Sequence, residues 1–244
     1  MHSPHLLGYS LAILSAKADY FQTSLNMTQT EFGAVVSLMP TVLAYSITDK
    51  VMPTVDYLLS IGCNAAQVRR IILKYPQVIT CSIENNLKPT VTFLKSALSL
   101  QTNTGDLVRI IHMFPPLLWL SVEGNLAPKI TYFRTEFNYT NAEIRSLLTS
   151  MPQILGQSLS ANIIPTIEYF KSVGIDSDQL GQSLLDMPSL IAYSLEKRII
   201  PRAEEMATQG ILLKLVSLGC IMMPEKQYQK WLANQKSVWS VVNE

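Results

Sequence analysis

The stretch Met151-Pro152-Gln153-Ile154-Leu155-Gly156-Gln157-Ser158, followed by Pro165, decides the fold because the chain repeats its pattern. In every complete copy a serine lies six residues after a first proline, and a second proline lies seven residues after that serine. The serines of the five complete copies are Ser46, Ser82, Ser121, Ser158 and Ser194. A sixth copy starts near Ser10, with Lys17 in place of the second proline. The first prolines are 36 to 39 residues apart, and a repeat of this length predicts a stacked array of helical units.

Each repeat carries the signals of two helices. Twelve residues before each first proline lies a residue that can cap a helix N-terminus: Thr28, Asn64, Asn103, Thr140 and Asp176. Four of these five have a Glu or Gln three residues later, as a reciprocal capping box requires. Apolar residues follow at helical spacing, and the helix is expected to stop near the proline, which disfavours helical geometry in the residue before it.

The repeated serine is predicted to cap the second helix, because its hydroxyl can accept a hydrogen bond from an amide of the following turn. The second proline leaves two alternatives open: it kinks one long helix, or a short turn precedes a helix that begins with proline. A residue suited to a left-handed C-cap lies sixteen residues after four of the serines: Asn26, Gly62, Gly174 and Gly210. Leu98 and Phe137 stand at this position in the other two copies, which are expected to lack such a cap.

The composition suits a chain without an internal domain boundary. Apolar residues make up 48% of the 244 residues and charged ones 15%, so each unit has enough apolar surface to bury against its neighbours. Cys63, Cys81 and Cys220 are far apart and are expected to be buried small hydrophobes rather than metal ligands or disulfides.

No apolar run reaches the ~18 residues of a membrane span, so we expect no membrane association. The chain begins inside a repeat, so we expect it to be a trimmed or partial form of a longer protein.

These units resemble the mitochondrial transcription termination factor (mTERF) repeat. The segment Tyr193-Ser194-Leu195-Glu196-Lys197-Arg198-Ile199-Ile200-Pro201-Arg202 is similar to the S-L-E-x-R-I-x-P-R stretch of plant and algal organellar members. The resemblance covers about residues 3–210. In the last copy Pro224 keeps the period, but Lys230 stands where the serine should be and Ser237 where the second proline should be. Residues 1–210 are therefore predicted to form the repeat array and residues 211–244 a C-terminal helical cap.

The resemblance implies an all-α solenoid of about six repeats, a curved superhelix or half-ring that holds double-stranded DNA or structured RNA. Members of the family act in mitochondria or chloroplasts, in transcription termination, its regulation, or RNA splicing and processing. On this basis we expect a monomeric organellar regulator whose transit peptide is not part of this chain, with organellar protein partners as a further expectation.

The basic residues are unevenly distributed, although the net charge is only +1. Residues 61–134 hold eight basic and three acidic residues, a net charge of +5, whereas residues 135–193 hold two basic and six acidic ones, a net charge of −4. Lys95, Arg134 and Lys171 each lie thirteen residues after a serine, so they are predicted to form a ladder that meets phosphates. The candidate nucleic-acid-binding residues are Arg69, Arg70, Lys74, Lys95, Arg109, Lys129, Arg134, Arg145, Lys171, Arg198 and Arg202. The alternative is that these are ordinary solvated surface charges.

Aromatic residues recur eleven positions after the serines, at Tyr57, Phe93, Tyr132 and Tyr169. Aromatic side chains stack on bases in RNA-binding modules, but these four lie beside leucine positions and are expected to be core. Asp176, Asp178 and Asp186 would repel phosphate, so the contact surface is not expected to run evenly through the fifth unit.

No motif for catalysis is present. The sequence has no glycine-rich phosphate loop and no H-E-x-x-H motif. The repeated serines have no histidine partner, His2 and His5 are terminal, and His112 is expected to face solvent. We therefore expect a non-enzyme with no cofactor and no metal. Two functional classes stay open: a nucleic-acid-binding regulator, and a protein-binding helical-repeat scaffold without nucleic-acid contact, which the near-neutral net charge favours.

Overall fold

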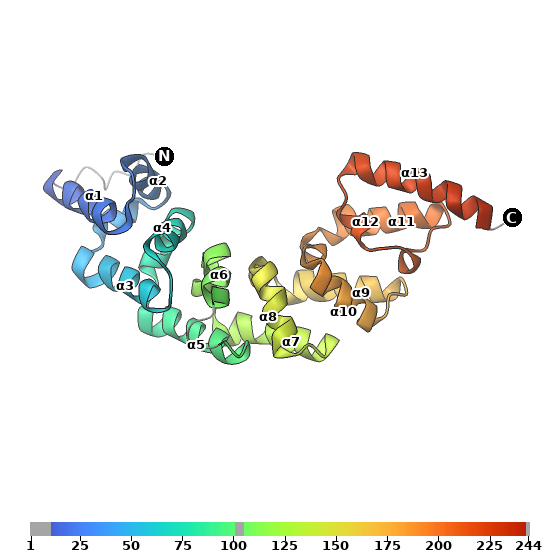
Figure 1. Ribbon diagram of the computed structural model, residues 1–244, viewed down its shortest axis with the longest axis horizontal. Coiled ribbons are helices and arrows are strands. Elements are labelled where there is room, and N and C mark those ends of the chain that lie inside the picture. The colour runs from blue at the N-terminus through green and yellow to red at the C-terminus, as the bar shows by residue number, and fades with distance from the viewer. Residues whose placement is uncertain (1–10, 101–104, 243–244) are drawn as a thin grey trace. The chain divides into compact units, whose positions relative to one another are not determined.

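The computed structural model describes residues 11–100 and 105–242, with side chains from 14 to 235 within those ranges. It forms two compact units, Met1–Ala127 and Pro128–Glu244 (Figure 1). All regular secondary structure in the described residues is helical and follows the repeat, so the predicted all-α repeat fold is confirmed. Ser10, His2, His5 and the candidate cap Asn103 lie outside the described residues.

The helices alternate between the first and second helix of each repeat. The first unit contains α1 (Leu11–Leu25), α2 (Gln29–Leu38), α3 (Met52–Ser60), α4 (Ala65–Lys74), α5 (Lys88–Ala97) and α6 (Gly105–Met113). The helix α7 (Ala127–Phe137) begins at the boundary. The second unit continues with α8 (Asn141–Ser150), α9 (Ile164–Ser172), α10 (Ser177–Asp186), α11 (Ile200–Thr208), α12 (Gly219–Met222) and α13 (Glu225–Val242).

Packing runs from neighbour to neighbour within each unit. In the first unit α2, α4 and α6 follow one another along one side, whereas α3 and α5 lie along the other (Figure 1). The helix α4 packs against both α2 and α6, and in the second unit α10 packs against α8. Such stacking is what a repeat array requires, and it brings the same face of successive first helices together.

The first helix of each repeat is fixed by its predicted cap. Thr28, Asn64 and Thr140 form reciprocal capping boxes with the residue three positions later. Asp176 accepts a hydrogen bond from the amide of Gln179, without the reciprocal bond. Three of the four predicted boxes are therefore confirmed. A 3-10 turn then starts at the first proline of each repeat: Pro40–Ala44, Pro76–Thr80, Pro115–Trp119, Pro152–Gly156 and Pro188–Ala192.

The second helix begins with a π-helical turn. Of the two alternatives for the second proline, the structure therefore has the short turn before a helix that begins with proline. Ser46 Oγ accepts a hydrogen bond from the amide of Asp49 at 3.2 Å, and the amide of Val51 bonds to the Ser46 carbonyl, five residues back, at 3.1 Å. The turn continues directly into α3, where Pro53 is the second residue. Proline lacks the amide hydrogen and its ring collides with the carbonyl four residues earlier in an α-helix, so a wider turn before it relieves the conflict. The equivalent turns are Ile83–Leu87, Val122–Leu126, Leu159–Ile163 and Leu195–Ile199.

The second helices end in left-handed residues in all six copies. Asn26, Gly62, Gly174 and Gly210 have φ values between 51° and 106°, which confirms the predicted C-caps. The expectation that the other two copies lack such a cap was wrong, because Ser99 (φ 52°) and Asn138 (φ 54°) are left-handed one residue later. The helices α5 and α7 extend further past their serines than α3 does, and this moves the cap along the chain.

The repeated apolar positions form the core. Cys63, Cys81 and Cys220 are buried free thiols whose pKa burial raises to about 11, as expected for small core residues. Among the described helices, none combines the length and the apolar character that crossing a membrane requires. After α11, the turn Leu213–Leu215 leads to α12, which packs against α13 and the turn Pro188–Ala192. The role of residues 211–244 as a cap stays a prediction.

Candidate nucleic-acid interface

Basic side chains gather on the exposed faces of α4 and α6. Arg70 and Lys74 are four residues apart on α4, and Arg109 and His112 are three apart on α6, so each pair shares one helix face. Arg70, Lys74 and Arg109 are exposed, and the apolar residues of both helices point into the core. Since α4 and α6 pack side by side, these four residues form one surface, which we call the α4–α6 basic cluster.

His112 lies inside this cluster rather than facing solvent, so that expectation was wrong. Its side chain is half-buried, and among the described residues its Nε2 has no hydrogen-bond partner. Burial lowers the pKa of His112 below its ordinary value, and the positive charges of Lys74 and Arg70 lower it further. Lys74 and Arg70 therefore both act electrostatically on His112.

Arg69 is turned toward the preceding repeat. Its Nη1 donates to the backbone carbonyl of Asn26 at 2.8 Å and lies 4.0 Å from the Glu31 carboxylate. The side chain is half-buried. Arg69 therefore helps to hold α4 against the repeat before it and is less available to a phosphate than its neighbour Arg70.

The predicted ladder on the second helices is partly neutralised by the protein itself. Lys171 forms an ion pair with Glu136 of the preceding repeat. The Nη2 of Arg134 donates to Asn141 Oδ1 at 2.7 Å. Lys95 is half-buried on α5, and Arg145 is half-buried on α8. These four side chains are therefore less available to a phosphate than the cations of the α4–α6 basic cluster.

Two candidates are buried, and placing them in the interface was wrong. Lys129 is 2% exposed, and its Nζ donates to the Leu155 carbonyl at 2.6 Å. Burial lowers the pKa of the Lys129 ammonium. Arg202 is 6% exposed, and its Nη1 donates to the carbonyls of Cys220, Ile221 and Met223. Neither cation can reach a phosphate without abandoning these hydrogen bonds.

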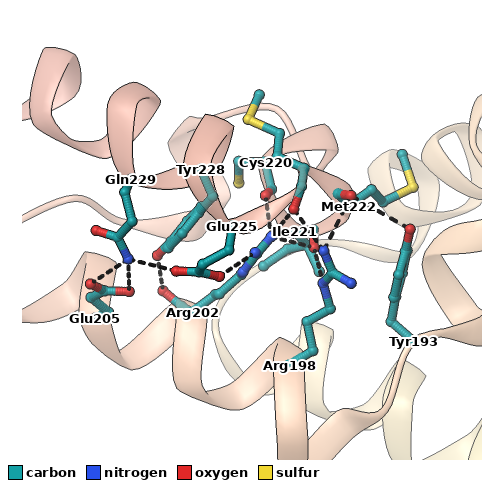
Figure 2. Close-up of polar contacts among 11 residues, drawn as sticks. Tyr193, Arg198, Arg202, Glu205, Cys220, Ile221, Met222, Glu225, Tyr228 and Gln229 are labelled. Carbon is teal, nitrogen blue, oxygen red and sulfur yellow. Dashed lines mark hydrogen bonds and ion pairs between the residues drawn. The ribbon is translucent and has the colours of Figure 1, made fainter.

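The arginines at the end of the array attach the C-terminal segment to α11 (Figure 2). Arg202 pairs with Glu225 at 2.8 Å and stacks over the Tyr228 ring at 4.2 Å. The half-buried Arg198 donates to the Met223 carbonyl at 2.6 Å and lies 4.3 Å from the centre of the Tyr193 ring. Burial and the Glu205 charge raise the pKa of the Tyr228 hydroxyl. The segment Ser194–Arg202 therefore has a structural role here.

These contacts belong to a pattern that the sequence analysis missed. A cation of one repeat donates to a backbone carbonyl of the following segment, which lies in or next to a 3-10 turn for the lysines and in or just after α12 for the arginines. We call this arrangement a carbonyl tie. Lys17 donates to Leu43 O, and Lys50 Nζ donates to Cys81 O at 2.7 Å. The tie residues are Lys17, Lys50, Lys129, Arg198 and Arg202. The signal in the sequence that could have revealed these ties is a basic residue four, seven or eight positions after the repeated serine.

The recurring aromatics are half-buried, not fully in the core as expected. Tyr57, Phe93, Tyr132 and Tyr169 each precede a buried residue, which is Leu58, Leu94, Phe133 or Phe170. Burial, followed by nearby carboxylates, raises the pKa of Tyr57 and of Tyr132 to about 12. Trp119, which the sequence analysis did not single out, is by contrast 53% exposed at the end of its 3-10 turn.

The described residues contain no group of three or more His, Cys, Asp or Glu side chains suited to a metal ion. In a comparison with protein-family models, the model described as mTERF matches residues 1–103 and, in a second and overlapping match, residues 55–186. Members of that family are organellar nucleic-acid-binding regulators rather than enzymes.

Proposed function

The chain belongs to the mTERF family, and from this premise we propose that it regulates organellar gene expression by binding duplex DNA or structured RNA. The α4–α6 basic cluster is the centre of the contact surface. Transcription termination or its control, or RNA splicing and processing, is the step served. The segment Ser194–Arg202 supports a plant or algal type, in a mitochondrion or a chloroplast.

One observation carries this proposal: Arg70, Lys74 and Arg109 are exposed on adjacent helices, and none of them belongs to a carbonyl tie. The proposal is supported by the pKa of His112, which burial lowers and which the charges of Lys74 and Arg70, both acting at this point of the surface, lower further. A phosphate at that point would relieve their mutual repulsion. Guanidinium groups also bind phosphate oxygens in a bidentate manner.

Contacts of this kind supply affinity and position rather than sequence selectivity. Within the first unit the half-buried Lys95 is a weaker candidate, since it is partly withdrawn from solvent. In the second unit Arg134 and Arg145 are half-buried candidates, and α10 carries the acidic residues Asp178 and Asp186.

The test is a charge reversal with a matched control. We expect Arg70→Glu with Arg109→Glu to weaken binding of a 30-base-pair duplex by about 100-fold at low salt, across unrelated sequences. The control is Lys226→Glu with Lys230→Glu, which changes the net charge equally at two exposed positions of α13 and should leave affinity within about threefold. Equal losses in the two double variants would remove the cluster from the interface.

A protein-binding scaffold is the second candidate. It is favoured by the near-neutral net charge and by the exposed Trp119, which lies outside the basic cluster. Duplex and structured RNA binding that is absent at low salt would favour this candidate over the first.

A further inference from the structure

A groove lies between two repeats of the first unit, next to Trp119. It has a volume of about 380 Å³ and runs between the π turn that follows Ser82 and the end of the 3-10 turn before Ser121. Asn86, Pro89 and Thr90 line it on one side, and Trp119 and Glu123 on the other. Glu84 also lines it and forms an ion pair with Lys88, whose side chain is half exposed and does not line the groove.

The same position in neighbouring repeats holds a cation of the protein itself. Lys50 lies four residues after its serine, and Lys129 lies eight after its own. Both ammonium groups donate to carbonyls of the following repeat, at 2.7 and 2.6 Å. In the groove beside Trp119 the corresponding residues are Asn86 and Thr90, which are short and uncharged. This junction therefore lacks the cation found at the Ser46 and Ser121 junctions, as does the Ser158 junction, where Asn162 and Thr166 also line a groove.

The lining favours a positive charge mainly through Glu123, because Glu84 already pairs with Lys88. Its described residues include Glu84 and Glu123 but no Lys or Arg. Both glutamates lie in the first turn of a helix, where the helix dipole offsets part of their charge. The tie junctions have the same helix termini and still hold ammonium groups, so the dipole does not prevent cation binding.

Trp119 indicates what kind of cation would bind. It is the most exposed aromatic ring at any described 3-10 turn, at 53%. An indole face attracts ammonium and guanidinium groups, and it packs well against the aliphatic part of Lys and Arg side chains. Pro89 supplies a further apolar surface in the groove.

We propose that this groove binds a lysine or arginine side chain from a partner protein, which completes the junction as Lys50 and Lys129 complete theirs. The charged group would take the place of the missing carbonyl tie, with its aliphatic stem against Trp119. This second site is separate from the α4–α6 basic cluster in its residues and has the opposite charge preference.

The experiment uses the full chain and the peptide Gly-Lys-Gly-Lys-Gly-amide, labelled with fluorescein at its N-terminal amine so that both lysines stay charged. Binding is followed by fluorescence anisotropy at low salt. We expect saturable binding. Asn86→Lys supplies an internal cation at the position of Lys50 and should weaken peptide binding at least tenfold. Trp119→Ala should weaken it by about fivefold through loss of the cation–π contact. Gln77→Lys adds the same charge at an exposed position outside the groove and should change binding less than about twofold.

Circular dichroism melting checks that the variants fold. If Asn86→Lys does not fold, Glu123→Gln at an exposed position replaces it, with an expected loss of about threefold. Absence of saturable peptide binding to the unmodified chain would overturn the proposal. Equal affinity of Asn86→Lys and Gln77→Lys, or of Glu123→Gln and the unmodified chain, would overturn it as well.

Discussion

The first helices of the two units have the same backbone but differ in surface charge. In the first unit the exposed positions of α4 and α6 carry Arg70, Lys74 and Arg109. In the second unit the equivalent positions of α8 carry Ser146 and Ser150, and those of α10 carry Gln182 and Asp186. Caps and prolines are shared by both units, whereas charge is not. The repeat therefore fixes the architecture, and the exposed residues of individual repeats decide where a polyanion binds.

The largest expected effect tests this difference directly. Replacing Arg70, Lys74 and Arg109 together by serine makes the first unit resemble the second at these positions. We expect a loss of duplex affinity of about 100-fold near 50 mM salt and a decrease of two to three in the slope of log K against log salt, about one for each phosphate contact. The measurement is an anisotropy titration over a salt series. An unchanged slope would show that the cluster does not contact phosphates.

The next effect separates buried cations from exposed ones. Lys129→Thr introduces threonine, which is the natural residue at the equivalent position of three other repeats: Thr54, Thr90 and Thr166. Because the Leu155 carbonyl loses its donor and a long side chain is removed, we expect a loss of about 1–3 kcal/mol of unfolding free energy, with duplex affinity unchanged.

The control for Lys129→Thr is Lys171→Thr, which removes an exposed ion pair with Glu136 and should cost at most about 1 kcal/mol. Urea denaturation measures both variants. Comparable losses would contradict the distinction between a carbonyl tie and a surface charge.

A smaller effect tests what the two units share. Ser82→Ala and Ser158→Ala each remove the hydroxyl that accepts an amide hydrogen bond, from Asn85 and Ala161 respectively. Each should lower the unfolding free energy by about 1 kcal/mol. Ser96→Ala, inside α5, serves as the control and should be neutral or slightly stabilising, because alanine is the better helix former. A large difference between the two cap variants would mean that the serine cap does not contribute equally to the stability of the two units.

The smallest effect is a pH dependence of binding. In the free protein the pKa of His112 lies below its ordinary value because of burial and the charges of Lys74 and Arg70. A bound phosphate would raise that pKa, so the complex takes up a proton as the pH falls through the interval between the two values. Duplex affinity should therefore increase a few-fold, roughly from pH 7.5 to 6. His112→Gln should remove this increase, and a pH-independent affinity of the unmodified chain would argue against phosphate at the cluster.

Local signals were sufficient to predict the repeat. The caps Thr28, Asn64 and Thr140 and the left-handed Gly62, Gly174 and Gly210 act through contacts a few residues away, so their spacing is visible in the sequence. The left-handed Ser99 and Asn138 were missed because helix length moved the cap and neither residue is a glycine.

The candidate site could be predicted only in part, because the direction of a long side chain depends on the neighbouring repeat. Lys129 and Lys171 are both lysines of second helices, yet one donates to an internal carbonyl and the other pairs at the surface. Spacing from the serine distinguishes them only when the carbonyl of the following repeat is known. For Arg70 and Arg109, by contrast, helical periodicity alone places the side chain opposite the buried stripe, and both are exposed.

The carbonyl ties also imply that the repeats do not resist mechanical separation equally. Pulling the Ser46 and Ser82 repeats apart must break a charge-assisted hydrogen bond from Lys50 as well as apolar packing. At the following junction Asn86 and Thr90 occupy the tie positions, and neither carries a charge. The preceding junction therefore has a charge-assisted contribution to its mechanical resistance that the junction beside Trp119 lacks.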